Sequence, residues 1–258
     1  MTMKYLKYFF LFSFIFVSFY GTDKVLVYLD NKKPLMKEIM SVQDNYLTEP
    51  VNGVIKDNTI IPGISGRSVN LKASLVKMED FGDFNENFLV YDEIKPDISL
   101  NKNLDKIIIR GNSKKRMVSL VLEDNKDILR YLDSIDVKYD VLANKDSSFS
   151  DNLEYLNGYQ NKEDFNDLES ILKNKKKSTK ICLLDVNNYD LCLKKKYYLV
   201  FSSLASDNKI NDILSNISSG EIILIKKSTS LSNMKLIISE INRQDLKIVF
   251  LSELISES

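Results

Sequence analysis

Apolar and polar positions alternate in a regular way over the second half of the chain. Short, mainly apolar runs, typical of buried strands, are separated by stretches in which apolar residues recur every three or four positions, as they do in helices. The predicted strands cover residues 106–111, 117–122, 137–143, 179–186, 197–203, 221–227 and 246–252. The predicted helices cover residues 125–135, 163–174, 208–220 and 232–244. This alternation predicts parallel βα units, with helices covering a hydrophobic sheet.

The N-terminus has the pattern of a targeting segment. An uncharged, phenylalanine-rich run at residues 8–20 follows Lys4 and Lys7. As a helix this run reaches about 20 Å, which is short of the ~30 Å hydrocarbon core but suits the apolar part of a secretory signal. A cleaved signal peptide and an uncleaved signal-anchor are both open for residues 1–21. In either case the lysine flank predicts an extracytoplasmic protein, secreted or held at the membrane by this segment.

The first half of the chain lacks the βα alternation. It contains two isolated helical patterns, at residues 34–47 and 68–82, with a loop rich in glycine and proline between them. An extended segment follows at 87–100. These changes predict four parts, namely the targeting segment (1–21), a connector (22–50), a small α+β region (51–106) and a βα domain (107–258).

The amino-acid composition excludes some partners and some catalytic groups. The 36 acidic and 36 basic residues balance, so no global field would attract nucleic acid, and no nucleic-acid partner is expected. The chain has no histidine, which excludes imidazole as a ligand, base or acid.

The two cysteines, Cys182 and Cys192, lie ten positions apart across a polar segment. In an oxidising compartment they can form a disulfide, which would stabilise the fold by about 2–3 kcal/mol. The alternative is that they are two small buried apolar residues. Without histidine they make a poor zinc site.

One predicted strand ends abruptly at two acids. Residues 117–122 are apolar except for one serine, and Glu123 and Asp124 follow directly. Because parallel βα folds bind ligands at the carboxyl ends of their strands, these acids are candidates for chemistry. The plainer interpretation is that both carboxylates stabilise the N-terminus of the next helix.

The stretches "GNSKKRMVSLVLEDN" (111–125) and "SSGEIILIKKSTSLSNMKLIISEINRQDLKIVFLSELI" (218–255) resemble the two ends of the NodB-homology domain of polysaccharide deacetylases, carbohydrate esterase family 4. Residues 60–99 resemble the region before that domain in a divergent, membrane-attached branch of low-GC Gram-positive bacteria. The resemblance covers roughly residues 50–258. It implies an α/β fold, an incomplete (β/α) barrel of about six strands over 107–258.

The resemblance also assigns roles to single residues. The family's catalytic base, an aspartate, falls on Glu123, and its metal-binding aspartate falls on Asp124. The two histidines of its His-x-x-x-His motif, which complete the metal site, fall on Asn157 and Asn161. The histidine of its late Leu-His motif, the general acid, falls on Lys226.

These replacements remove the parts that the family's reaction needs. The reaction uses zinc or another divalent metal, held by about three protein ligands, to polarise an N-acetyl carbonyl. Neutral asparagine carbonyls are weak ligands for zinc, and an ordinary lysine, with a pKa near 10.4, is a poor proton donor. We therefore expect no cofactor, and we interpret Glu123, Asp124 and Lys226 as vestiges of a site.

Three functions follow from this sequence. The first is a non-catalytic relative of the deacetylases on the outer membrane face, in contact with cell-wall polysaccharide. The second is an active N-acetyl-glycan deacetylase with a rebuilt site, in which Glu123, Asp124 and Lys226 still work. The third is a structural module that binds a protein partner and uses the barrel only as a scaffold.

Overall fold

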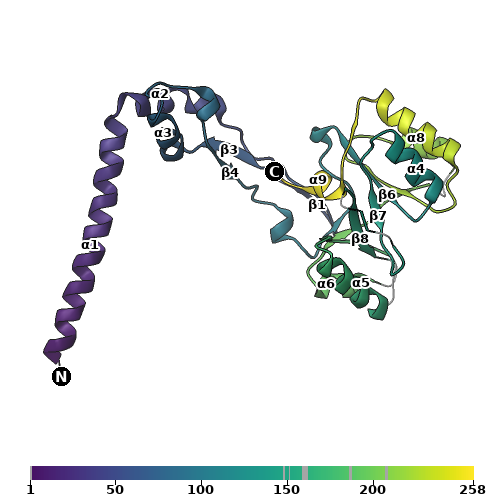
Figure 1. The fold of residues 1–258 in the computed structure, drawn as a ribbon, viewed down its shortest axis with the longest axis horizontal. Coiled ribbons are helices and arrows are strands. Elements are labelled where there is room, and N and C mark those ends of the chain that lie inside the picture. The colour runs from purple at the N-terminus through teal and green to yellow at the C-terminus, as the bar shows by residue number, and fades with distance from the viewer. Residues whose placement is uncertain (1, 148, 151, 159–161, 186–187, 207–208) are drawn as a thin grey trace. The chain divides into compact units, whose positions relative to one another are not determined.

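The computed structural model describes residues 2–258 except 148, 151, 159–161, 186–187 and 207–208 (Figure 1). The chain forms two compact units. The first unit comprises Met1–Glu49 and Gly66–Ile94, and the second comprises Pro50–Ser65 and Lys95–Ser258.

The first unit combines helices with a small antiparallel sheet. Its elements are α1 (Thr2–Lys32), α2 (Pro34–Val42), α3 (Leu71–Glu79), β3 (Gly66–Val69) and β4 (Tyr91–Ile94). Pro34 occupies the first turn of α2, and the side chain of Asn70 caps α3 by accepting from the backbone N–H of Ala73 at 2.9 Å. A local core joins these elements, with Met36, Ile39, Val69, Leu75, Met78 and Leu89 buried in it.

Helix α1 contains the apolar run at residues 8–20 and continues well past it. Over the described residues, no helix is long and apolar enough to cross a membrane. The N-terminal membrane segment expected from the sequence is therefore not supported. The physical reason is that the uncharged run is short, and the helix that contains it goes on through charged positions such as Asp30 and Lys32.

The second unit is built on one curled sheet (Figure 1). Its strand order is β1-β2-β5-β10-β9-β8-β7-β6-β12-β11, and β13 pairs with the start of β6. All pairs are parallel except β1 with β2. The strands are β1 (Val54–Lys56), β2 (Thr59–Ile61), β5 (Ile107–Ile108), β6 (Met117–Leu122), β7 (Asp140–Leu142), β8 (Glu154–Gly158), β9 (Ser178–Leu183), β10 (Tyr198–Val200), β11 (Leu204–Ala205), β12 (Ile222–Ile225) and β13 (Lys247–Ile248).

Helices cover the outer face of this sheet. They are α4 (Lys126–Ser134), α5 (Lys162–Asn174), α6 (Tyr189–Lys194), α7 (Ile210–Asn216) and α8 (Leu231–Arg243). Helices α4 and α8 pack side by side, and α5 and α6 cover the neighbouring strands (Figure 1). Alternate residues of β6, namely Val118, Leu120 and Leu122, face this helical layer and are fully buried. The period of two in β6 thus directs one set of side chains outward and the other into the barrel.

A short final helix, α9 (Leu251–Ile255), fills the barrel interior. Its residues Leu251, Leu254 and Ile255 are almost completely buried against inward-facing strand residues such as Val121 of β6. Burying three such side chains stabilises the fold by about 1.5–3 kcal/mol each. The interior is therefore a packed core, and ligands of this unit must approach one of its two ends.

Most predicted elements of residues 107–258 are present, but four differ, one of them β11, a short strand that the sequence did not predict. Strand β8 forms where the sequence is mixed in polarity, and its last residue is Gly158, where a Cβ would lie 2.5 Å from the carbonyl oxygen of Leu183. Helix α6 replaces the polar turn expected between the cysteines. The final predicted strand, 246–252, divides into β13 and α9. Within 107–258 the described residues therefore form nine strands, β5 to β13, rather than about six.

Candidate functional site

Glu123 and Lys226, the residues at the family's base and general-acid positions, follow the carboxyl ends of β6 and β12. The strands pair in parallel with Leu122 opposite Ile225, so that Glu123 and Lys226 follow side by side. The Nζ atom of Lys226 lies 3.1 Å from Oε1 of Glu123, and each side chain is one-quarter exposed. The second oxygen, Oε2, accepts from the backbone N–H of Lys227 at 2.9 Å. Both carboxylate oxygens of Glu123 are therefore occupied by donors from the protein.

The next two residues lead into α4. Asp124 is exposed, and Asn125 is the residue that caps the helix, because its Oδ1 accepts from the backbone N–H of Ile128 at 3.3 Å. The side-chain cap of α4 is thus Asn125, and the two acids precede it. The Nδ2 atom of Asn125 also donates to two carbonyls of the loop after β12, at 2.9 and 3.2 Å. This amide fixes the loop that carries Lys226 against the start of α4.

Two buried hydroxyls, which the sequence did not single out, lie beneath the ion pair. Ser206 follows β11 and Thr229 lies in the loop after β12, and their hydroxyls are hydrogen-bonded to each other. The Oγ atom of Ser206 also accepts from the backbone N–H of Lys226 at 2.6 Å. The hydroxyls therefore hold the backbone on which Lys226 stands. A single serine or threonine in a loop gives no sequence signal for such a role.

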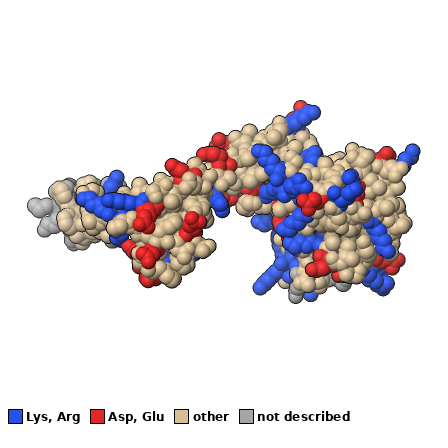
Figure 2. Space-filling view, turned by 90° about the horizontal axis from the view of Figure 1, so that it is seen from above, with Lys and Arg blue, Asp and Glu red and all other residues tan. Residues whose placement is uncertain are grey.

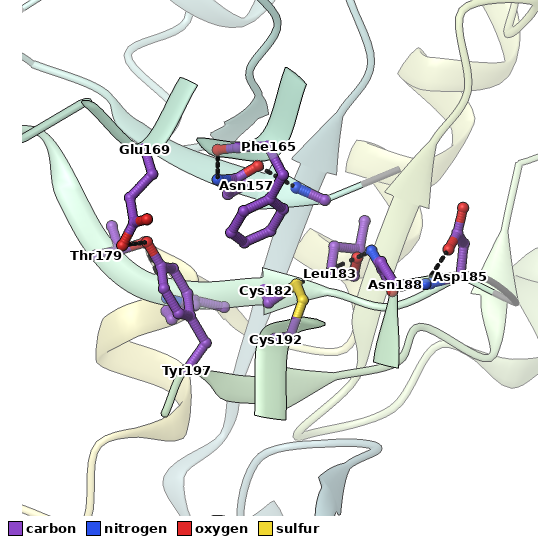
Figure 3. The surroundings of a disulfide bond; sticks show 12 residues. Asn157, Phe165, Glu169, Thr179, Cys182, Leu183, Asp185, Asn188, Cys192 and Tyr197 are labelled. Atoms are coloured by element: carbon purple, nitrogen blue, oxygen red, sulfur yellow. Dashed lines mark hydrogen bonds between the residues drawn. A yellow bond between two sulfur atoms is a disulfide. The ribbon is translucent and has the colours of Figure 1, made fainter. Parts of the chain in front are cut away.

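Asn157, at the position of the family's first histidine, lies in β8 and is 1% exposed. Its Nδ2 donates to the carbonyl of Phe165 in α5 at 3.3 Å, and its Oδ1 accepts from the backbone N–H of Gly158 at 2.9 Å (Figure 3). Both ends of the amide thus serve the packing of α5 on β8. Asn161, at the second histidine position, lies outside the described residues.

The side chains at the positions of the family's metal site do not fit a catalytic zinc ion. Over the described part of the chain, no three Cys, Asp or Glu side chains gather in a way that could hold a metal ion. A hydrolytic zinc site requires about three ligands together with open positions for water and substrate. Here the one exposed carboxylate, Asp124, stands beside a carboxylate that is already paired with Lys226.

Cys182 of β9 and Cys192 of α6 form a disulfide, with their Cα atoms 6.2 Å apart (Figure 3). Both cysteines are fully buried, in a cluster with Phe165, Tyr197 and Leu199. The bond ties the short helix α6 to the outer face of the sheet. Among the described residues between them, the side chain of Asn188 donates to the carbonyl of Leu183 at 3.0 Å.

We call the loops at the carboxyl ends of the strands the carboxyl edge. Apart from the loops described above, this edge carries an exposed aromatic ring and exposed polar side chains. Phe201 follows β10 and is 47% exposed, while its backbone N–H is held by the carbonyl of Ile108 at 2.9 Å. The loop after β7 exposes Asn144 and Asp146. This edge can therefore offer one aromatic face together with amide and carboxylate groups to a ligand.

A second acid pair, also missed in the sequence, lies inside the barrel. Asp140 of β7 is fully buried and stands opposite Glu154 of β8. Its Oδ2 accepts from the Oγ of Ser119 at 3.0 Å and from the backbone N–H of Leu251 at 2.8 Å, so that it caps α9. Burial raises the pKa of Asp140 well above its usual range, and the charge of Glu154 raises it further. Asp140 therefore keeps its proton to a higher pH than an ordinary aspartate does.

No family model matches this sequence. Among curated proteins, the uncharacterized protein YlxY of Bacillus subtilis is 36% identical over 93 residues. This match spans 36% of the chain and only 29% of the length of YlxY.

Solved structures give wider coverage. The CE4 family pseudoenzyme BA3943 from Bacillus anthracis aligns with a TM-score of 0.55 at 19% identity, over 88% of this chain and 96% of that one. A BA3943 mutant described as having restored enzymatic activity aligns with a TM-score of 0.54 at 18% identity, over 87% of this chain and 99% of that one. The chain thus has the fold of a divergent, NodB-like polysaccharide deacetylase domain. The resemblance seen in the sequence is confirmed at the level of the fold.

Proposed function

We propose that this chain is a non-catalytic, deacetylase-like protein that works outside the cytoplasm and binds cell-wall glycan at its carboxyl edge. One observation carries the proposal. The carboxylate at the position of the catalytic base, Glu123, is paired with Lys226 at 3.1 Å and with a backbone N–H at 2.9 Å.

This pairing makes Glu123 less available as a general base. A general base must have an oxygen within hydrogen-bond reach of the water that it deprotonates. Each oxygen of Glu123 already accepts a hydrogen bond from the protein, and these bonds compete with a water for the same carboxylate. The chain has no histidine to complete a metal site or to protonate a leaving amine. BA3943, described as a pseudoenzyme, shares this fold over most of the chain, so a non-catalytic protein with this fold has a precedent.

The location follows from two features. Disulfides form and persist mainly in oxidising compartments, and Cys182 and Cys192 are joined in one. The N-terminal run at residues 8–20, preceded by lysines, has the length and composition of a secretory signal.

The proposed glycan contact rests on the exposed groups of the carboxyl edge. Aromatic faces pack against the apolar faces of sugar rings, and amide and carboxylate groups bond to hydroxyls. Phe201 supplies the ring, and the loop after β7 supplies Asn144 and Asp146.

The test uses the full chain and oligomers of N-acetylglucosamine. We expect no release of acetate at any zinc concentration, and measurable binding of the oligomer by calorimetry. Phe201→Ala should weaken that binding about tenfold, which corresponds to about 1.4 kcal/mol, without changing the unfolding midpoint. Lys56→Ala, at an exposed position beside the start of β2 and so at the other edge of the sheet, is the control. Release of acetate that Asp124→Ala abolishes would instead establish an active, rebuilt site.

A further inference from the structure

Two runs of lysines have no part in the proposed function. They meet at the amino edge of the sheet, by which we mean the loops that lead into the amino ends of the strands. One run lies between α5 and β9, and the other lies between α6 and β10. Because β9 and β10 are parallel neighbours, with Ile181 opposite Tyr198, these two entering loops lie side by side. We call their seven lysines the lysine cluster: Lys173, Lys175, Lys176, Lys177, Lys194, Lys195 and Lys196.

One carboxylate links the two runs. The Nζ atom of Lys173 lies 2.9 Å from Oε1 of Glu169, and Lys195 is paired with the other oxygen. The hydroxyl of Tyr197 donates to the same carboxylate at 3.3 Å (Figure 3). Burial alone would raise the pKa of Glu169, but the two ammonium groups outweigh it and hold the pKa below its usual range. Glu169 therefore stays ionised, fixes the two loops together, and neutralises only a small part of the cluster's charge.

The rest of the cluster differs from the other basic residues of this edge. Lys and Arg side chains are spread widely over the second unit (Figure 2). Several at the amino edge are paired with acids, as in Lys138–Glu253 at 3.1 Å and Arg116–Asp245 at 3.3 Å. By contrast, four members of the cluster are exposed and form no ion pair with any residue that the structure describes: Lys175, Lys176, Lys194 and Lys196.

Two of these four lysines have a backbone conformation that non-glycine residues seldom adopt. Lys176 and Lys196 each follow the end of a helix, and both have a φ of 57°, in the left-handed region where glycine or asparagine is favoured. A residue with a Cβ is disfavoured there by about 1–2 kcal/mol. Two loops of equal length thus place lysine at a position where the backbone prefers glycine.

A hollow of about 440 Å³ adjoins the cluster. Its lining includes Lys176 and Lys177 together with the hydroxyl residues Ser178, Thr179 and Ser252. Ammonium and hydroxyl groups are the side-chain donors that phosphate oxygens accept from. Glu154 also lines the hollow, and its Oε1 accepts from the Oγ of Ser252 at 2.5 Å.

We propose that the lysine cluster binds a linear polymer that carries closely spaced phosphate groups. A row of exposed ammonium groups on two adjacent loops matches a ligand whose charges repeat along a chain, and the hollow accommodates one phosphate with its linker. A lipid surface fits less well, because no large apolar side chain is exposed among the described residues of 162–200 that could enter a bilayer. This site is separate from the carboxyl edge and does not depend on the proposed glycan contact.

The test compares two full-length variants with the same total charge. In the first, Lys175, Lys176, Lys194 and Lys196 become Gln, while Lys173 and Lys195, which hold Glu169, are kept. In the second, four exposed lysines away from both edges' proposed contacts, Lys37, Lys56, Lys72 and Lys95, become Gln. Each variant loses four positive charges from a net charge of zero. Binding of labelled inorganic polyphosphate is followed by fluorescence anisotropy between 50 and 200 mM salt.

The first variant should bind polyphosphate at least about tenfold more weakly than the parent, and the slope of log affinity against log salt should fall by about three. The second variant should stay within about twofold. Both should unfold at the parent's midpoint and bind N-acetylglucosamine oligomers as the parent does. Equal losses in both variants would overturn the proposal, since they would show attraction by total charge alone. Tighter binding of the parent to phosphatidylglycerol vesicles than to polyphosphate would also overturn it.

Discussion

The two ends of the barrel each carry a pair of acids, and the pairs do opposite things. At the carboxyl edge Glu123 is one-quarter exposed and bonded to Lys226, and Asp124 faces solvent. At the amino end Asp140 is fully buried, meets Glu154, and caps the helix that fills the interior. The side chains are chemically alike, so the difference comes from burial and partners. We therefore expect the exposed pair to tolerate substitution, and the buried pair to be needed for the fold.

The largest expected effect is the loss of Asp140. Asp140→Ala removes the acceptor for two buried donors, the hydroxyl of Ser119 and the N–H of Leu251, and leaves Glu154 without its neighbour. The free energy of unfolding should fall by about 3 kcal/mol, measured by chemical denaturation. A loss below about 1 kcal/mol would contradict the structural role that we assign to this pair.

The same residue predicts a pH dependence. The pKa of Asp140 is raised in the folded state, so the folded protein holds a proton that the unfolded chain releases at a lower pH. The stabilisation is complete below the unfolded pKa, near 3.9, and is lost as pH rises from there toward the folded pKa, by at most about 1.4 kcal/mol per pH unit. Asp140→Asn, which mimics the protonated acid, should flatten this part of the stability profile. An unchanged profile in this variant would show that the proton lies elsewhere.

A smaller effect is expected at the carboxyl edge. Glu123→Gln weakens a partly exposed ion pair and leaves an amide oxygen to accept from Lys227, so the free energy of unfolding should fall by only about 0.5–1 kcal/mol. Lys226→Met should give a similar loss, and the two changes together should be less than additive. If the losses simply add, the two residues are not coupled and the 3.1 Å contact contributes nothing.

The smallest effect is expected for Asp124→Ala. The side chain is exposed and α4 is capped by Asn125, so stability should change by less than about 0.5 kcal/mol. Binding of N-acetylglucosamine oligomers and biological function should also persist. Complementation of a deletion strain tests this, with the Phe201→Ala variant as the contrasting case.

The resemblance to the deacetylases places Glu123 and Lys226 at one site, and in the structure they follow the paired strands β6 and β12. It does not predict β8, where Asn157 and Gly158 interrupt the apolar pattern and pairing with β7 and β9 decides the conformation. Asp140 did carry a signal, since a lone acid inside the apolar stretch 137–143 is unusual for a buried strand. The hydroxyls of Ser206 and Thr229 carried none.

The position of α9 determines when the second unit can finish folding. Leu251 packs in the interior beside β6, yet 129 positions separate it from Leu122, the last residue of that strand. Contacts between such distant segments form slowly, because a long loop must close before they stabilise the fold. A growing chain that has not yet reached residue 251 holds its strands around an unfilled apolar interior. During that interval the protein depends on chaperones, or on remaining unfolded, to avoid aggregation.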